Sequence, residues 1–159
     1  LKMGSGTSGK LVTEVKKRML SSAPPETDFA IIDGSPGIGC PVIASMSGVS
    51  MVLIVAEPSV SGISDMERII RTAEIFHTPL CVCVNKADVN PEMTARIERF
   101  CEEKHIPFVG TIPYDPLAVT AINRVKTIIE LDCPSGRAVR EIYAETMHLL
   151  ETRTGGAKA

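Results

Sequence analysis

The sequence contains no tryptophan, and aromatic residues make up only 4% of its 159 residues. Hydrophobic residues nevertheless make up 44%, so most of the apolar side chains are aliphatic. Strands of a parallel sheet that is buried on both faces are rich in such side chains, whereas an aromatic-rich β-sandwich is not favoured by this composition. A chain of this length suits one domain with a sizeable core. The composition therefore favours a single α/β domain.

The sequence also lacks a signal peptide, a long apolar run and an excess of basic charge. No segment approaches the roughly 18 apolar residues that a membrane-spanning helix needs. The formal net charge is −2, and lysine and arginine are interspersed with acidic residues, so no basic stripe for nucleic acid or polybasic membrane anchor is present. The five cysteines are odd in number, which indicates a reducing compartment. We expect a cytoplasmic protein with no nucleic-acid or membrane partner.

The cysteines and histidines do not form a metal-ligand pattern. Cys81 and Cys83 lie two residues apart in an apolar run, and a C-x-C pair of this kind could ligate a metal. No second cysteine or histidine cluster completes such a site, so we expect both thiols to pack in the core. The other three cysteines and the three histidines are scattered, and we assign none of them a function.

Apolar runs alternate with amphipathic segments along most of the chain. Strands are expected at 29–33, 51–58, 80–85 and 108–113, with a brief edge strand at 127–129. Helices are expected at 8–22, from Pro41, and at 64–77, 91–105, 116–124 and 135–152. This alternation predicts a parallel sheet with helices on both faces, whose ligands bind at the carboxyl ends of the strands. We expect one domain over 1–152 and a disordered tail over 153–159.

The stretch GSGTSGKLV, from Gly4 to Val12, resembles a phosphate-binding loop of the form G-x-x-x-x-G-K-[ST]. The next residue after the lysine is Leu11, which has no hydroxyl for Mg²⁺, and no apolar strand leads into the stretch. Ser8 as a helix N-cap, with Gly9 and Lys10 in the first turn, is the better interpretation.

The segment AIID, which ends at Asp33, is an apolar run that closes on a carboxylate. This is the Walker B arrangement, in which a strand aims its aspartate at the magnesium shell beside the phosphates. Four residues later, Gly37 could offer its backbone N–H to a terminal phosphate. The alternative is that Asp33 only caps the turn into the next helix.

Asn85, Lys86 and Asp88 form an N-K-x-D sequence directly after the expected strand 80–85. In many GTPases this pattern recognises the base, because the lysine stem covers the ring and the aspartate accepts from guanine. The alternative is that asparagine and aspartate simply favour a turn at this point.

Five stretches, taken in order, resemble the MinD/ParA/Mrp superfamily of P-loop ATPases, and more narrowly its members with an inserted ferredoxin domain. They are SGKLVTEVKKR, IIDGSPGIGCPVIAS, LIVAEPSVSGISDMERI, VNKADVNPEM and VGTIPYDP. The resemblance covers about residues 8–150 and matches the C-terminal part of the family. It implies a P-loop NTPase fold of the SIMIBI type, incomplete at its N-terminus.

The resemblance also implies roles for individual residues. Asp33 would be the Walker B carboxylate and a magnesium ligand, and Gly37 would be the switch glycine near the γ-phosphate. Asn85 would contact the purine, and Lys86 and Asp88 are candidate base-binding residues from the N-K-x-D sequence. Pro113, Tyr114 and Asp115 would line it. The base in this family is adenine, so we favour ATP with Mg²⁺ as cofactors and keep a GTP-binding SIMIBI-type protein as the alternative.

The resemblance places the P-loop strand, its lysines and the cysteine clusters that hold 4Fe-4S centres upstream of Leu1. We therefore expect this chain alone to be inactive, since phosphoryl transfer depends on positioning and charge neutralisation. The intact protein would be an iron–sulfur-associated ATPase that acts as a homodimer, with an iron–sulfur client protein. Leu1 is not methionine, which favours truncation over a natural split subunit completed by a partner; a non-catalytic interaction module is the further alternative.

Overall fold

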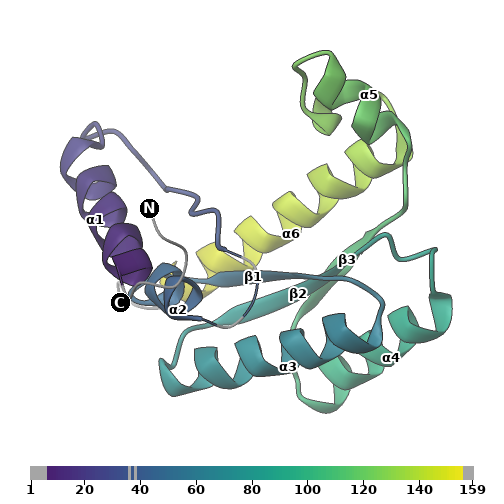
Figure 1. The fold of residues 1–159 in the computed structure, drawn as a ribbon, viewed down its shortest axis with the longest axis horizontal. Coiled ribbons are helices and arrows are strands. Elements are labelled where there is room, and N and C mark those ends of the chain that lie inside the picture. Colours follow the sequence, from purple (N-terminus) through teal and green to yellow (C-terminus); the bar gives the residue numbers. More distant parts are fainter. Residues whose placement is uncertain (1–6, 36, 38, 156–159) are drawn as a thin grey trace.

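The computed structural model describes residues 7–35, 37 and 39–155. In this part of the chain the sheet has three parallel strands in the order β1-β2-β3, flanked by helices (Figure 1). The strands are β1 (Val52–Ala56), β2 (Leu80–Asn85) and β3 (Phe108–Ile112). The helices are α1 (Thr7–Ser22), α2 (Cys40–Met46), α3 (Val60–Ile75), α4 (Pro91–Glu103), α5 (Leu117–Asn123) and α6 (Pro134–Gly155), with a 3₁₀ turn η1 (Ile128–Glu130). The expected α/β class with a parallel sheet is confirmed.

Helices cover both faces of the sheet, as the alternation of elements predicts. Helices α3 and α4 lie on one side and α6 lies on the other (Figure 1). The larger core lies on the α3 and α4 side, where Met66 and Ile97 are fully buried against Val82 and Val84 of β2. The smaller core joins Ile142 of α6 to the opposite face of β2.

Cys81 and Cys83 belong to this smaller core, beneath α6. Both thiols are buried and free, and burial raises the pKa of each, to about 12 for Cys83. A thiol with such a raised pKa is a poor metal ligand because it resists ionisation. The expectation that these two cysteines are core residues is confirmed.

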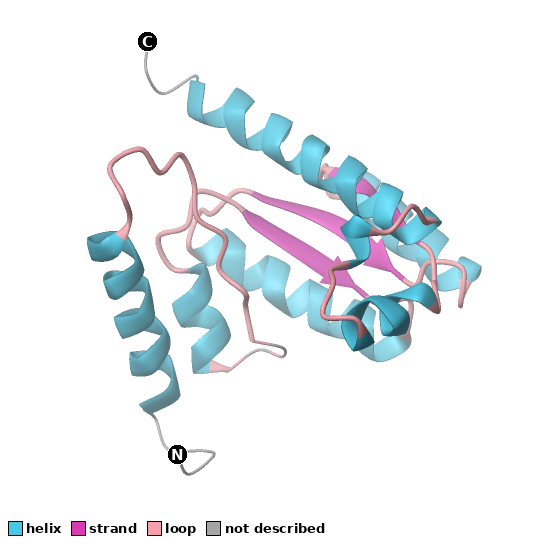
Figure 2. Ribbon diagram, turned by 90° about the horizontal axis from the view of Figure 1, so that it is seen from above, coloured by secondary structure: helices cyan, strands magenta, loops and turns pink. Residues whose placement is uncertain are grey.

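Helices α1 and α2 form a separate pair at one side of the sheet (Figure 2). Met46 of α2 is buried beside Ala73 of α3, which fixes α2 to the rest of the fold. Helix α1 is attached through Lys16, whose ammonium donates to the carbonyl oxygens of Ala44 at 3.2 Å and Ser45 at 3.1 Å. These are carbonyls of the last turn of α2, which lack partners within the helix, so a lysine there is favourable.

Two expected strands are wrong. Residues 29–33 form a loop rather than a strand, because no neighbouring strand among the described residues hydrogen-bonds to them. Residues 127–129 were expected as an edge strand, but they enter the 3₁₀ turn η1. A capping box causes this turn, since the Glu130 carboxylate accepts from the backbone N–H of Thr127 at 2.7 Å and from its hydroxyl at 2.9 Å.

The outer edge of β1 carries no strand partner in the part of the chain described. Leu53 and Val55 of β1 lie in register with Cys81 and Cys83, so they point to the α6 side of the sheet. Their exposed fractions are 38% and 54%, whereas Cys81 and Cys83 are fully buried. Helix α6 therefore covers β2 and β3 on this face and leaves the apolar face of β1 open.

Candidate functional site at the carboxyl edge of the sheet

Three loops meet at the carboxyl edge of the sheet, one after each strand. The first contact joins the loop after β1 to the loop after β2, where the Lys86 ammonium lies 2.8 Å from the Glu57 carboxylate. The hydrogen bond to Glu57 raises the pKa of Lys86. Lys86 has a φ of +53°, an uncommon backbone conformation for a residue with a side chain. Such conformations concentrate at functional sites.

Asp88 joins the loop after β2 to the loop after β3. The backbone N–H of Tyr114 donates to Asp88 Oδ1 at 2.7 Å, and the backbone N–H of Ala87 donates to the carbonyl oxygen of Ile112 at 3.0 Å. A separate bond, from the Thr94 hydroxyl of α4 to the carbonyl oxygen of Ala87 at 2.7 Å, ties the loop after β2 to α4. The two loops are therefore held at a fixed separation.

Asp115 ties the loop after β3 to the helices that follow it. Its Oδ1 accepts from the backbone N–H of Leu117 at 2.9 Å, and its Oδ2 accepts from the hydroxyl of Ser135 at 2.9 Å. The bond from Leu117, followed by those from Ser135, holds the pKa of Asp115 below its ordinary value. The Asp115 carboxylate therefore fixes the start of α5 against the start of α6.

The remaining two predicted base-site residues lie in the same cluster. Asn85 closes β2, and its side-chain oxygen accepts from the backbone N–H of Lys86 at 3.0 Å. Pro113 directly follows β3 and precedes Tyr114, whose side chain is exposed. The structure thus brings together the residues expected to recognise a base: Asn85, Lys86, Asp88, Pro113, Tyr114 and Asp115. Their role in binding a nucleotide stays a prediction.

Two residues of this cluster were missed by the sequence analysis. Glu57 directly follows β1, and the rule that parallel strands end at one edge of the sheet could have identified it. Ser135 lies in the first turn of α6, and no motif marks it in the sequence.

Asp33 and Gly37 lie in the loop between α1 and α2. No hydrogen bond or ion pair joins the exposed Asp33 carboxylate to another described residue. Gly37 has a φ of +91°, and open space surrounds the position where a Cβ would lie. That Asp33 and Asn85 face one pocket stays a prediction.

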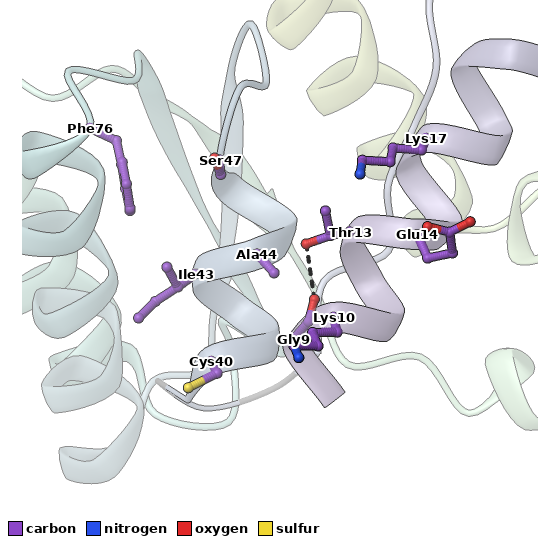
Figure 3. A pocket seen from close by; sticks show the side chains of 10 residues that line it. All are labelled: Gly9, Lys10, Thr13, Glu14, Lys17, Cys40, Ile43, Ala44, Ser47 and Phe76. Atoms are coloured by element: carbon purple, nitrogen blue, oxygen red, sulfur yellow. Dashed lines mark hydrogen bonds between the residues drawn. The ribbon is translucent and has the colours of Figure 1, made fainter. Parts of the chain in front are cut away.

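The P-loop-like stretch forms part of helix α1 from Thr7 onward, and Gly4 lies outside the described residues. The helix begins at Thr7, so Ser8 lies inside its first turn rather than before it. Gly9 and Lys10 line an open groove of about 630 Å³ between α1 and α2 (Figure 3). A Cβ on Gly9 would lie 3.3 Å from the Cβ of Cys40, so this glycine permits close approach of the two helices. The expectation that Gly9 and Lys10 belong to a helix is confirmed.

The described residues contain no group of three or more histidine, cysteine, aspartate or glutamate side chains that could hold a metal ion. A magnesium ion bound with a nucleotide needs less, because it keeps several waters and uses one or two carboxylates besides the phosphates. The exposed and unpaired Asp33 carboxylate fits that limited role. None of the described helices is long and apolar enough to span a bilayer.

Comparisons with known proteins identify a structure with a similar fold. No protein-family profile matches the chain. The MinD cell division protein of Aquifex aeolicus superposes with a TM-score of 0.70 at 24% identity, over 88% of this chain and 61% of that protein. The fold is therefore similar to that of MinD, which agrees with the expected parallel sheet with helices on both faces.

Sequence relatives agree with the fold. An uncharacterised protein of Methanocaldococcus jannaschii is 32% identical over 57% of this chain and 32% of its own length. An uncharacterised ATP-binding protein of the same organism is 25% identical over 74% of the chain and 46% of its length. An iron-sulfur cluster carrier protein of Pyrococcus furiosus is 24% identical over 94% of the chain and 56% of its length. Together with the MinD structure, these similarities support a relationship to MinD-like ATPases. The chain spans 32% to 56% of the length of these three relatives.

Proposed function

We propose that this chain is the part of a MinD-type ATPase that carries the Walker B carboxylate and the base-recognition loops, and that its phosphate cradle comes from a different polypeptide segment. Adenine would lie against Asn85 and the 113–115 loop, and the N–H of Gly37 would approach the γ-phosphate. Asp33 would hold Mg²⁺ through water, and the ion would neutralise phosphate charge. The relationship to MinD-like nucleotide-binding proteins supports this proposal.

The observation that carries the proposal is the open edge of β1, together with an apolar segment that has no strand partner among the described residues. Residues 29–33 read FAIID, and Phe29 and Ile31 are exposed although they are apolar. The edge of β1 likewise exposes Leu53 and Val55. One additional parallel strand between them would pair with β1 and with 29–33, and would bury these side chains. A strand of this kind is what a P-loop requires immediately before it.

The test is to combine this chain with the polypeptide encoded immediately upstream of Leu1, once that segment is found to encode K-G-G-x-x-K-[ST]. We expect the chain alone to release no phosphate from ATP, and the combination to hydrolyse ATP in a Mg²⁺-dependent reaction. Asp33→Asn should lower this rate by about tenfold or more, because the carboxylate is lost from the metal shell. Asp28→Asn, in the same exposed loop, should leave the rate unchanged.

Equal rates for Asp33→Asn and Asp28→Asn would remove Asp33 from the site. A combined protein that binds no nucleotide would instead favour a non-catalytic interaction module. A separate upstream gene would identify a split subunit, whereas a continuous reading frame would identify a single longer protein. Competition between ATP and GTP on the combined protein decides between the two bases.

We further propose that the intact ATPase works with iron–sulfur clusters and acts as a homodimer. The relative of Pyrococcus furiosus that is named an iron-sulfur cluster carrier protein supports the first point. The cluster would be cargo passed to a client protein, held by cysteines of a ferredoxin insert. Clustered Cys-x-x-Cys sequences in the upstream reading frame would support this arrangement, and their absence would contradict it. The cytoplasmic location stays a prediction.

A further inference from the structure

We infer that Asp88 is a positioning residue that holds the Pro113–Asp115 loop in place, and that it does not read a guanine base. This inference rests on the function proposed above, because it concerns the base pocket of that same site. It addresses which purine the pocket accepts, a question that the N-K-x-D sequence leaves open.

The Asp88 carboxylate is exposed, and its hydrogen bond runs to the neighbouring loop after β3. Its Oδ1 accepts the backbone N–H of Tyr114 at 2.7 Å, a short bond with a charged acceptor. The bond from Ala87 N–H to the carbonyl oxygen of Ile112 runs in the opposite direction between the same two loops. Together they form a reciprocal pair, which extends the pairing of β2 with β3 beyond Asn85 and Ile112.

A carboxylate that reads guanine accepts from both N1–H and the 2-amino group, and it uses both of its oxygens. The Oδ1 of Asp88 already accepts the Tyr114 N–H, so a guanine edge would compete with that backbone donor for the same oxygen, and a backbone donor that lost its partner would destabilise the loop. Adenine has neither an N1–H nor a 2-amino group, so it requires no carboxylate at this position. The Pro113–Asp115 loop, positioned by Asp88, can instead present its backbone groups to the adenine edge, and Asn85 at the end of β2 can present its side chain.

Lys86 supports the same conclusion from the other charged position of the motif. Its ammonium contacts Glu57 at 2.8 Å in the loop after β1. Lys86 thus links the ends of β1 and β2, while Asp88 links the ends of β2 and β3. Both charged side chains of the N-K-x-D sequence connect neighbouring loops.

The first experiment measures solvent exchange of the Tyr114 amide by NMR in the chain as it stands. We expect Asp88→Ala to accelerate this exchange by about ten- to a hundredfold, since a hydrogen bond to a charged acceptor is lost. Asp88→Asn keeps a side-chain oxygen that can accept, so most of the protection should return. Amides of Val82 and Val84, buried in β2, report whether each variant is folded. Asp65→Ala, which removes an exposed carboxylate from α3, is the matched control and should leave Tyr114 exchange unchanged.

The second experiment titrates the combined protein, with this chain as the wild type or as Asp88→Asn, with ADP, GDP and XDP, followed at the amides of Asn85 and Tyr114. If Asp88 is a positioning residue, we expect the wild type to show no preference for GDP over ADP, and Asp88→Asn to show the same order of affinities. A guanine reader predicts a GDP preference that passes to XDP in Asp88→Asn, because a carboxamide complements the 2-oxo group of xanthine.

The outcomes separate this inference from the proposed function. Unchanged Tyr114 exchange in Asp88→Ala, or a GDP preference that passes to XDP in Asp88→Asn, would overturn the positioning role. If no nucleotide shifts either amide, the proposed base pocket fails, and the exchange data still decide whether Asp88 holds the loop.

Discussion

Val125 adopts a backbone conformation that β-branched residues rarely occupy. Its φ is +56°, and its side chain is 97% exposed, so no packing contact compensates for the strain. Left-handed backbone costs a residue with a Cβ about 1–2 kcal/mol, and glycine loses part of that gain through its greater freedom when unfolded. We expect Val125→Gly to raise the free energy of unfolding by about 0.5–1 kcal/mol, measured by urea titration.

The matched control is Val119→Gly, at an exposed valine inside helix α5. Glycine is unfavourable in a helix interior, so this variant should be less stable than the wild type by about 0.5 kcal/mol. Opposite signs for the two substitutions would show that backbone conformation decides the effect. A loss of stability in Val125→Gly would contradict the interpretation and imply that the valine side chain has a partner.

At the scale of elements, Asp115 connects β3, α5 and α6, and this makes stability depend on pH. Its folded-state pKa lies below the ordinary value near 4, mainly because Leu117 N–H donates to the carboxylate. Between the unfolded and folded pKa values the unfolded chain binds more protons, so stability falls as the pH falls through this range. We expect Asp115→Asn to lack this component in urea titrations between about pH 2 and pH 6. Ser135→Ala should reduce it, and identical pH profiles in all three proteins would contradict the assignment.

The elements that the sequence predicted well are those whose pattern depends on local packing. The run LCVCVN predicted β2 to the residue, because every one of its positions from Cys81 to Val84 is buried on both faces of the sheet. Residues 29–33 carry a similar apolar run, but a strand exists only when a neighbouring strand satisfies its backbone groups. An apolar run of this kind therefore indicates that a segment can pair as a strand. Whether a neighbouring strand is present cannot be predicted from the same five residues.

The base-recognition cluster was predictable for a related reason. Asn85 and Tyr114 follow parallel strands, and parallel strands bring their carboxyl ends to one edge of the sheet. The direction in which each side chain turns could not be predicted in this way. Asp88 and Lys86 suggested a guanine reader, but their contacts with Tyr114 and Glu57 depend on the loops that surround them. The spacing of residues along the sequence predicts which residues lie near one another. The hydrogen bonds that they form depend on the conformation of the folded loops.

At the scale of the whole molecule, the sheet is covered by helices at β2 and β3 but is open at β1. Helix α6 and helices α3 and α4 enclose β2 and β3, whereas β1 exposes its edge and one apolar face (Figure 1). An edge with neither lysine nor proline is a template for pairing with another chain. The residues of β1 are VLIVA, which include neither. The open edge of β1, which would pair with a phosphate-loop strand, therefore also allows the isolated chain to associate with other copies.

We expect the isolated chain to self-associate as its concentration rises, measured by sedimentation velocity across a dilution series. Val55→Lys should shift the distribution toward monomer, because a charge on the open face of β1 opposes pairing and apolar contact with a second copy. Ile122→Lys, at an exposed apolar residue of α5 that does not belong to β1, is the matched control and should not change the distribution. Adding the polypeptide that completes the sheet should suppress association in the wild type, since it occupies the same edge. A wild-type chain that stays monomeric throughout the series would show that residues 29–33 or the loop around them already protect the β1 edge in solution.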